Sequence, residues 1–274
     1  MTSPLLIGTS GHYYDEWRGV FYPSHVTKKQ RLSYYASVFP ALEINATYYG
    51  TPKRESARRM VREAAGRLSF SIKAPGDMTH RVRTDAETVS PFLDYIAPFR
   101  EAEVLVAVLL QFPNALRNAP HERERMRQVF DSLTDLPLAV ELRHSSWDTA
   151  DADDFLRDNA VSRVTIDQPS LRGLSRSLRH VQTGPLAYFR FHGRNASSWY
   201  GSDSPSGSDR YRYRYTRDEL LPWVPVIRDA SEQATTTVAF FNNHPDGNAV
   251  LDALAFAEMS GHPLPLPDSG DLFS

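Results

Sequence analysis

The sequence contains no cysteine, which excludes several kinds of chemistry before any motif is considered. A chain without cysteine has no disulfide framework, no thiolate nucleophile and no zinc site built on thiolate ligands. Metal sites made of histidine and carboxylate ligands are still open to it. Long hydrophobic runs are also absent, because the longest, VLVAVLL at 104–110, is far shorter than the ~20 residues of a membrane-spanning helix.

Charge of one sign is not in excess either. The 274 residues include 31 Lys and Arg and 33 Asp and Glu, which give a formal net charge of -2. No overall positive field is therefore present to hold nucleic acid without regard to its sequence. The first residues, MTSPLLIGTSG, enter a strand-like run at once, so we expect no signal peptide. We expect a cytoplasmic protein that has no membrane partner.

Short strand-like segments recur along the chain, rich in β-branched and aromatic residues and bounded by Gly, Pro and Ser. There are eight of them, at 5–10, 41–48, 68–74, 104–112, 138–143, 162–167, 186–192 and 236–242. Helix-like segments lie between almost all of them, and one begins with a favoured pair, Ser90 as the N-cap and Pro91 as the first residue. The connection at 168–184 is the least helical.

Strands that alternate with helices indicate a parallel sheet, and eight such units predict one closed barrel. We therefore predict an α/β protein with a single (β/α)8 TIM-barrel-like domain over residues 1–274. The alternative, an open doubly wound sheet, would favour a Gly-rich phosphate loop after the first strand. The candidate for such a loop, GTSG at 8–11, lacks the G-x-G-x-x-G pattern. After the seventh strand, the unusually long loop at 194–215 is predicted to form a lid over a site.

The fifth strand-like segment, LAVELR at 138–143, alternates apolar residues with a glutamate and an arginine. Successive side chains of a strand point to opposite faces, so Val140 and Leu142 share one face while Glu141 and Arg143 share the other. The same split occurs in the second, third, sixth and seventh strands. In a barrel, we expect the apolar faces to pack against helices and the polar faces to line the axis. The predicted inward set is Glu43, Asn45, Lys73, Glu141, Arg143, Asp167, Arg190 and His192, with Gln111 and Asn243 at its edge.

These polar side chains cluster toward the C-terminal ends of the strands, which is where barrel enzymes place their catalytic groups. A buried charge needs a partner or a ligand. The set has three anions and three cations, so a self-contained network of salt bridges is the structural alternative to an active site. Branched apolar residues fill most barrel interiors, and this favours a functional interpretation of the polar set.

Several motifs stand in a distinctive order between about residues 5 and 260. They read IGTSGHYYDEWRGVFYP, EINATYY, SIKAP with His80 shortly after, LLQFP, VELRHSSW, FRFHGR and FFNN. This series resembles the DUF72 family, also called the YecE-like family. The resemblance implies a TIM-barrel-like fold and supports the choice of residues, but it implies no settled activity. One departure is His12, which stands where the family's first motif more often has Trp, in G-T-S-G-W-x-Y.

We expect an enzyme that acts on a small anionic or polyol substrate by acid–base catalysis. Arg143 and Arg190 would hold a phosphate or carboxylate group with their forked donors. Lys73 would stabilise developing negative charge, act as a base if its pKa is lowered, or form a Schiff base. The candidate catalytic residues are Glu43, Lys73, Glu141, Asp167 and His192. The candidate substrate-binding residues are Asn45, Tyr49, His80, Gln111, Arg143, Trp147, Arg190, Trp199 and Asn243.

Two other kinds of function stay open. The oxygen and imidazole ligands of a metal-dependent hydrolase, phosphodiesterase or sugar isomerase would be Glu43, Glu141, Asp167 and His192. We assign no metal ligand, because the chain has no H-x-H or H-E-x-x-H spacing and the neighbouring cations would repel a metal ion. The second alternative is a nucleic-acid-binding or regulatory barrel without catalysis. RYRYRY at 210–215 alternates cations with aromatic rings, which suits either a single strand of nucleic acid or an extended lid strand with an exposed Arg face. The sequence assigns no cofactor and no oligomeric state.

Overall fold

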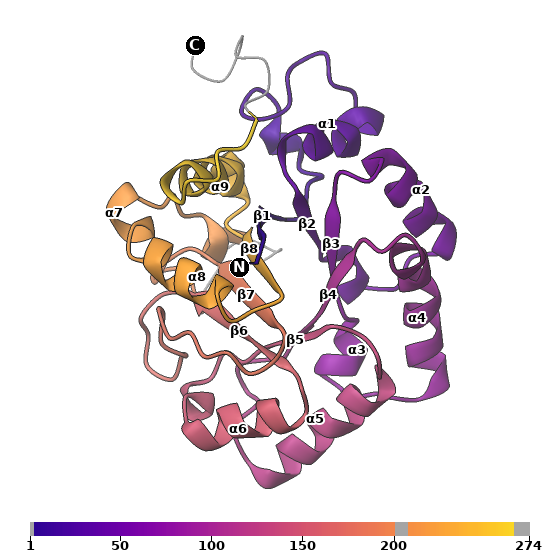
Figure 1. The fold of residues 1–274 in the computed structure, drawn as a ribbon, viewed down its shortest axis with the longest axis vertical. Helices are drawn as coiled ribbons and strands as arrows, with labels where there is room; N and C mark the ends of the chain where they lie inside the picture. Colours follow the sequence, from indigo (N-terminus) through magenta and orange to yellow (C-terminus); the bar gives the residue numbers. More distant parts are fainter. Residues whose placement is uncertain (1–2, 201–207, 266–274) are drawn as a thin grey trace.

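The computed structural model describes residues 3–200 and 208–265. Its centre is a closed barrel of parallel strands that follow one another in sequence order, as Figure 1 shows. The strands are β1 (Leu5–Ser10), β2 (Ala41–Ile44), β3 (Ser69–Lys73), β4 (Leu105–Gln111), β5 (Leu138–Glu141), β6 (Ser162–Asp167), β7 (Leu186–Phe191) and β8 (Thr236–Phe241). Because β1 pairs with both β2 and β8, the sheet has no free edge. The predicted (β/α)8 barrel is confirmed, and the open-sheet alternative is wrong.

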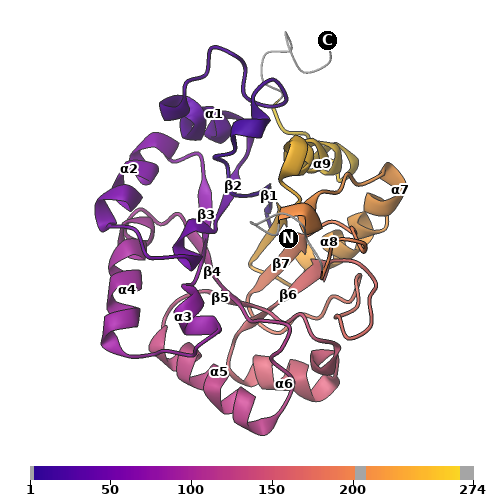
Figure 2. The ribbon, with the colours of Figure 1, turned by 180° about the vertical axis from the view of Figure 1, so that it is seen from behind.

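Helices form a ring around the barrel that is interrupted between α6 and α8, as the two opposite views in Figures 1 and 2 show. They are α1 (Arg31–Val38), α2 (Arg54–Ala64), α3 (Gly76–Thr79), α4 (Ala86–Glu101), α5 (Pro120–Ser132), α6 (Ala150–Asp158), α7 (Arg217–Leu220), α8 (Trp223–Ser231) and α9 (Asn248–Met259). Within the described ranges, no helix combines the length and the apolar character needed to cross a bilayer.

Helix α4 begins earlier than the sequence predicts. The side chain of Asp85, and not that of Ser90, caps it by accepting a hydrogen bond from the backbone N–H of Thr88 at 3.0 Å. Pro91 lies inside the helix and not at its first position. The predicted start at Ser90 and Pro91 is therefore wrong. Asp85 and Ser90 are both good N-cap residues. The start at Asp85 adds a turn of helix that buries Val89 in the core.

The strands separate two apolar cores because their side chains alternate. One core lies between the outer face of the barrel and the helices, and includes Phe70, Val140 and Phe191. The other fills the inside of the barrel. Its members are Ala41, Ala107, Leu109, Ala139, Val164, Ile166, Leu186, Tyr188, Val238 and Phe240. Polar inward-facing side chains come later along several strands, so they lie above this inner core, at the C-terminal mouth of the barrel.

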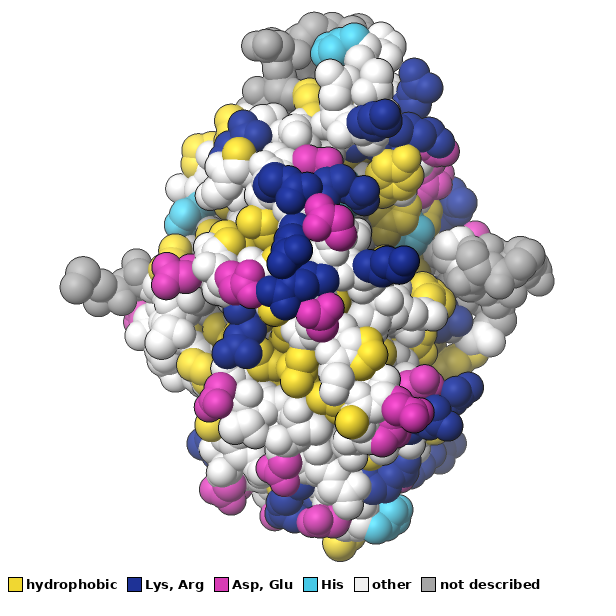
Figure 3. Space-filling view, turned by 90° about the vertical axis from the view of Figure 1, so that its right-hand side faces the viewer, with side chains coloured by type: hydrophobic (Ala, Val, Ile, Leu, Met, Phe, Trp, Pro, Cys, Tyr) yellow, Lys and Arg dark blue, Asp and Glu magenta, His cyan; other side chains and the backbone are white. Residues whose placement is uncertain are grey.

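The side of the molecule that carries α1, α2 and α4 in Figure 1 has mixed surface charge. Figure 3 shows Lys and Arg side chains gathered on this side with Asp and Glu side chains among them. Arg54 of α2 pairs with both Asp94 and Glu101 of α4, and Arg62 pairs with Glu55 at 3.1 Å. These exposed pairs contribute little to stability individually, and they keep the helix face solvated.

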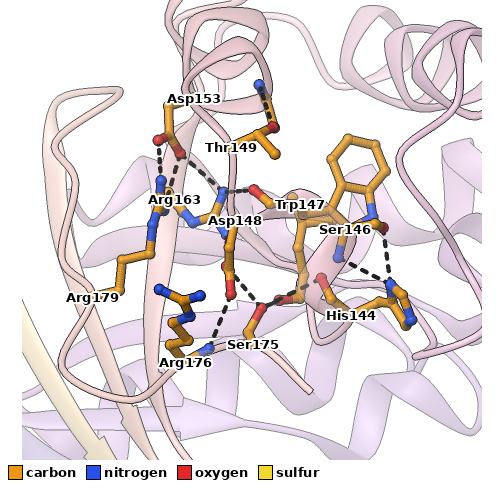
Figure 4. Close-up of polar contacts among 12 residues, drawn as sticks. His144, Ser146, Trp147, Asp148, Thr149, Asp153, Arg163, Ser175, Arg176 and Arg179 are labelled. Atoms are coloured by element: carbon orange, nitrogen blue, oxygen red, sulfur yellow. Dashed lines mark hydrogen bonds and ion pairs between the residues drawn. The ribbon is translucent and has the colours of Figure 1, made fainter. Parts of the chain in front are cut away.

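The connection between β6 and β7 contains no helix, as predicted, and a buried ion network attaches it to α6 (Figure 4). Arg163 of β6 donates from Nη1 to Asp153 at 3.0 Å and from Nη2 to Asp148 at 2.9 Å. Asp148 also accepts hydrogen bonds from the hydroxyl of Ser175 and from the backbone N–H of Arg176. Through Asp148, Arg163 thereby holds in place the connection between β6 and β7, which has no helix of its own.

We expect Arg163→Met to lower the free energy of unfolding by about 3–5 kcal/mol, because it leaves two buried carboxylates without their shared partner. Urea denaturation measures the change. Arg157→Met is the matched control, since Arg157 forms an exposed pair with Asp154 on α6 and its loss should cost less than about 1 kcal/mol. Equal losses in the two variants would contradict the structural role of Arg163.

Candidate functional site

Arg190 lies at the centre of the barrel mouth and joins two buried carboxylates. It reaches inward from β7 and donates from Nε and Nη2 to the two oxygens of Glu43 on β2, at 2.9 and 2.7 Å. Its Nη1 donates to Glu141 on β5. All three side chains are at most 1% exposed. The planar guanidinium matches the carboxylate geometry, so three strands on different sides of the barrel are tied together.

Both glutamates have further partners that hold them ionised. The hydroxyl of Tyr188 donates to Glu43 at 2.6 Å, and Nε of Arg143 donates to Glu141 at 2.6 Å. Burial alone would raise the pKa of each carboxyl, but the positive charge of Arg190 opposes it. The net effect lowers the pKa of Glu43 and places that of Glu141 well below its usual value. Neither carries a proton at neutral pH, which favours a positioning role over a general-acid role.

His192 lies directly after β7, with its ring between Glu141 and Asn242. Its Nδ1 lies 3.0 Å from the side-chain amide nitrogen of Asn242, and its Nε2 lies 3.2 Å from Glu141. Burial lowers the pKa of His192 to about 4, although Glu141 acts in the opposite direction. The ring is therefore neutral at pH 7. The amide of Asn242 donates to Nδ1, so the ring proton is on Nε2 and donates to Glu141.

Lys73, at the end of β3, is the cation of the site that has no anionic partner. Its Nζ donates to Oε1 of Gln111 at 2.9 Å and lies 4.2 Å from the ring centre of Tyr48. Among the described residues it forms no ion pair with a carboxylate. Burial, together with the positive charges of Arg190 and Arg143, lowers the pKa of Lys73 to about 7.

The charges inside the barrel mouth do not balance when Lys73 is protonated. Glu43 and Glu141 offset Arg190 and Arg143, and Lys73 is then surplus. The sequence predicted three anions against three cations, and hence a network that could satisfy itself. The third anion, Asp167, is absent from this network. The inward set therefore has room for one negative charge, and a ligand can supply it.

A cavity of about 690 Å³ opens above this network. Eight predicted substrate-binding or catalytic residues line it, namely Asn45, Tyr49, Lys73, His80, Gln111, Arg143, Arg190 and Trp199. Glu43, Glu141 and His192 are fully buried and lie outside the lining, in contact with Arg190 and Arg143. A bound molecule would thus meet Lys73 and the arginines first.

The sequence interpretation missed several other residues that line the cavity. These are Tyr14, Tyr48, Pro113, Asn114, Leu174, Tyr200, Ser208, Arg210, Tyr211, Asn242 and His244. Tyr48 lines the cavity beside the predicted Tyr49 of the motif EINATYY. In FFNN the sequence interpretation chose Asn243, whereas its neighbour Asn242 lines the cavity. For Leu174, which comes from the irregular connection after β6, the sequence offers no such signal.

Asp167 does not point to the barrel axis, and the predicted orientation of β6 is wrong. Ile166 belongs to the inner core, so its neighbour Asp167 faces the helices. There the carboxylate accepts hydrogen bonds from Tyr215 at 2.9 Å, from Nε1 of Trp223 at 3.0 Å and from Nη2 of Arg194 at 2.6 Å. The position of Asp167 indicates a structural role in attaching the loop after β7.

Two further predicted binding residues lie away from the cavity. Trp147 is fully buried in the outer core, donates from Nε1 to the carbonyl of Leu116 at 3.0 Å and belongs to the polar cluster of Figure 4. Asn243 also faces outward, and donates to Asp252 at 2.6 Å. Trp147 ends a short 3-10 helix, Ser145–Trp147, that follows β5, and Asn243 is the second residue after β8. Asn242 takes the inward position that was predicted for Asn243.

Part of the predicted lid, 194–215, lies against the cavity. Trp199 and Tyr211 line it, and their ring centres are 6.4 Å apart. The same two rings lie 6.4 and 6.0 Å from His192. Residues 201–207 of the predicted lid fall outside the described residues. The aromatic rings give the cavity a wall that suits a flat or apolar part of a ligand.

The metal-ligand set considered from the sequence is not assembled. In the described ranges, no group of three or more His, Cys, Asp or Glu side chains is placed to hold an ion. Asp167 faces outward, and Glu43 and Glu141 are bonded to Arg190. This arrangement disfavours the metal-dependent alternative.

The RYRYRY segment at 210–215 is largely engaged with the protein itself. Arg214 pairs with Asp252 at 3.0 Å, and the buried hydroxyl of Tyr215 donates to Asp167. Tyr211 turns into the cavity. The basic residues of α2 are interspersed with acidic ones (Figure 3). These contacts favour the lid interpretation of the segment over a nucleic-acid track.

The fold and this site define a (β/α)8 barrel with a charged, aromatic-walled cavity at its C-terminal mouth. Residues 6–269 match the family model described as Protein of unknown function DUF72, and the chain belongs to this family. It is 25% identical over 251 residues to the UPF0759 protein YunF of Bacillus subtilis, covering 87% of this chain and 89% of YunF.

Solved structures agree with this assignment. A DUF72 family protein from Thermotoga maritima is 35% identical, with a TM-score of 0.85 over 93% of this chain and 98% of that one. Another from Enterococcus faecalis is 25% identical, with a TM-score of 0.83 over 94% of this chain and 96% of that one. The resemblance found in the motifs is confirmed.

Arg190→Met should destabilise the protein by about 3–5 kcal/mol at pH 7, because Glu43 and Glu141 lose their shared partner. The lowered pKa of Glu43 means that its contribution is present above the unfolded-state pKa of ~4.3 and is lost as the pH falls through the folded-state value. The difference between the variant and the wild type should therefore shrink in acid. Urea denaturation from pH 7 to pH 3 tests this.

The control for Arg190→Met is Arg212→Met, which removes an exposed pair with Asp246. It should change stability by less than about 1 kcal/mol at every pH. A destabilisation by Arg190→Met that does not depend on pH would show that lost packing, and not the ion pair, is responsible.

Proposed function

We propose that the protein is an enzyme that binds a small substrate bearing a phosphate or carboxylate group at the C-terminal mouth of its barrel. The observation that carries this proposal is the surplus cation. The carboxylates of Glu43 and Glu141 form ion pairs with Arg190 and Arg143. Lys73 faces the cavity without an anionic partner. An anion entering the cavity would complete the charge balance of a group of side chains that is otherwise nine-tenths or more buried.

Arg143 is the residue best placed to anchor the anion. Its Nε is held by Glu141 at 2.6 Å, which fixes the plane of the guanidinium. Its Nη1 has no hydrogen-bond partner among the described residues, and the side chain lines the cavity. A preoriented guanidinium with a donor to spare is suited to a charge-assisted bond with a phosphate or carboxylate oxygen.

Lys73 is our candidate for the acid–base group of the reaction. A group that exchanges protons works best when its pKa lies near the operating pH, and the pKa of Lys73 is lowered to about 7. Glu43, Glu141 and His192 do not compete for this role, because the two carboxylates stay ionised and the imidazole stays neutral. They orient Arg190 and Arg143 instead.

The cavity walls restrict the substrate in size and shape. Trp199, Tyr211, Tyr14 and Tyr48 supply rings around a space of about 690 Å³, which lies within the range of sites for small metabolites. Rings exclude water and leave the charged floor in a less polar environment, where an ion pair with the substrate is stronger. Both features suit an anion attached to a compact organic body.

Arg143→Met should weaken the binding of sulfate and of oxalate by at least about tenfold, since a hydrogen bond to a charged group contributes ~1.5–3 kcal/mol. Isothermal titration calorimetry measures both anions. Arg81→Met serves as the control, because Arg81 is exposed and pairs with Asp77 outside this cavity. The proposal fails if neither anion binds the wild type, or if Arg143→Met binds them as well as the wild type does.

Anion binding should also draw a proton onto Lys73. With a pKa of about 7, the amine is mostly neutral at pH 8, and a bound anion raises its pKa. Proton uptake should approach one per anion at pH 8 and fall toward zero at pH 6, where the amine is already charged. Titrations with oxalate in buffers of different ionisation enthalpy give this number. In Lys73→Met no proton should be taken up when oxalate binds. Proton uptake that persists in this variant would show that a group other than Lys73 is protonated.

A further inference from the structure

Lysine is scarce in this chain, and one of its few copies occupies the floor of the cavity. The sequence has four lysines and 27 arginines. Lys28, Lys29 and Lys53 are exposed on the surface, whereas Lys73 is 9% exposed and lines the cavity. Arginine stays protonated in proteins, while lysine can lose its proton and become a nucleophile. Lys73, the basic residue of the site without a carboxylate partner, is therefore a lysine, which can be neutral, and not an arginine, which cannot.

We propose that Lys73 is a nucleophile that forms an imine with the carbonyl carbon of a substrate that also carries a carboxylate or phosphate group. This inference rests on the proposed anion site and adds to it the class of the substrate, an anionic aldehyde or ketone. It also adds a covalent step in which the amine itself takes part.

The surroundings of Lys73 fit a nucleophile better than a structural cation. A structural lysine at this depth would be paired with a carboxylate, because an unpaired buried charge is costly. Here Nζ instead meets a neutral carbonyl oxygen, Oε1 of Gln111, and the face of the Tyr48 ring. Oε1 of Gln111 also accepts from Arg190 at 3.4 Å, which holds it in place. The amine is positioned without being neutralised by an acid.

The two arginines favour the neutral amine before the substrate arrives. Arg190 and Arg143 act on Lys73 in the same direction as burial, and together they lower its pKa to about 7. A large fraction of the amine is therefore unprotonated near neutral pH and has a lone pair available for attack.

The step needs no redox partner, and its atoms balance. The lone pair of Nζ attacks the carbonyl carbon, a C–N bond forms, and the carbonyl oxygen accepts the electron pair and one proton that nitrogen releases. This gives a carbinolamine. The carbon–oxygen bond then breaks, and the hydroxyl leaves as water with a second hydrogen from nitrogen, so that a C=N bond remains. Protonation of the imine makes it an electron sink for a bond at the adjacent carbon.

Electrostatics give the reason for the anionic group on the substrate. A protonated imine carries one positive charge, which the neutral amine that it replaces does not. It would lie among Arg143 and Arg190, whose charges are already offset by Glu141 and Glu43. A neutral aldehyde would leave one uncompensated positive charge in the buried floor. A carboxylate or phosphate on the same molecule, held by Arg143, supplies the missing negative charge.

The test is reductive trapping of the imine on the full chain. The protein is incubated at pH 7 with sodium cyanoborohydride and one of three probes, which are glyoxylate, glycolaldehyde phosphate and uncharged glycolaldehyde. Peptide mapping by mass spectrometry then follows each of the four lysines separately. We expect Lys73 to be alkylated at least about tenfold faster than the exposed lysines by an anionic probe, since an ordinary lysine with a pKa of ~10.4 is almost fully protonated at pH 7. A stronger reaction with glyoxylate or with glycolaldehyde phosphate distinguishes a carboxylate substrate from a phosphate substrate.

Three variants sharpen the result. Arg143→Met should slow trapping at Lys73 by every probe, because Arg143 helps to lower the pKa of the amine, and it should slow the anionic probes more than glycolaldehyde, because only they lose their anchor. Lys73→Gln should abolish the fast adduct, and Lys53→Arg, which changes an exposed lysine, should retain it. Circular dichroism confirms that each variant is folded, and the wild-type comparison among lysines stands even if one of them is not.

The inference is overturned if an anionic probe labels Lys73 no faster than Lys28, Lys29 and Lys53, or if glycolaldehyde labels it as fast as the anionic probes do. Titration with oxalate separates this failure from failure of the proposed function. If oxalate binds in a way that depends on Arg143 but Lys73 forms no adduct, the imine proposal is contradicted and the proposed anion site is supported. Absence of both overturns both.

Discussion

The bond between Arg190 and two buried glutamates is the interaction on which the mouth of the barrel depends. Glu43, Glu141 and Arg190 come from β2, β5 and β7, so a single guanidinium holds together strands that do not pair with one another. Removing a carboxylate from water costs several kcal/mol, and only a close, well-oriented partner offsets that cost. The arrangement therefore fixes the side chains around it to within narrow limits, and it also explains the low pKa values of both glutamates.

This fixed centre determines what the surrounding residues can do. Glu141 orients Arg143 and accepts from His192, and the burial that surrounds them keeps the imidazole neutral. Because both carboxylates are engaged, none is left for Lys73, and the two arginines further disfavour its charge. The network that stabilises the barrel mouth thus leaves Lys73, at the floor of the cavity, without a carboxylate partner. The stability of the barrel mouth and the reactivity that we propose for Lys73 have the same origin, which is the pairing of both buried carboxylates with arginines.

Polar residues on the outside of the barrel have a different task. Asp167 binds Tyr215 and Trp223 and so attaches the loop after β7, and Arg163 attaches the irregular connection after β6 (Figure 4). Both loops contribute to the cavity, through Tyr211 and Leu174 respectively. Outward-facing charges of β6 thereby position two loops that reach the cavity. The supporting contacts thus start from the outer face of β6, whereas the charged floor of the site is built on the inner faces of β2, β3, β5 and β7.

The sequence by itself determined the alternation of strands and helices, the closed barrel, and most of the inward polar set, because side-chain periodicity and element order are local properties that a chain displays directly. It did not determine which face of a strand meets the axis when both faces can find partners. Val164 and Ile166 fit the apolar inner core as well as they would fit the helix side, and Asp167 found three partners outside. The choice between Asn242 and Asn243, and the burial of Trp147, also rested on how the chain turns at a strand end. Only the tertiary structure decided these points, because each one depends on which distant residues arrive beside the strand, and an amino-acid pattern with a period of two is the same for both faces.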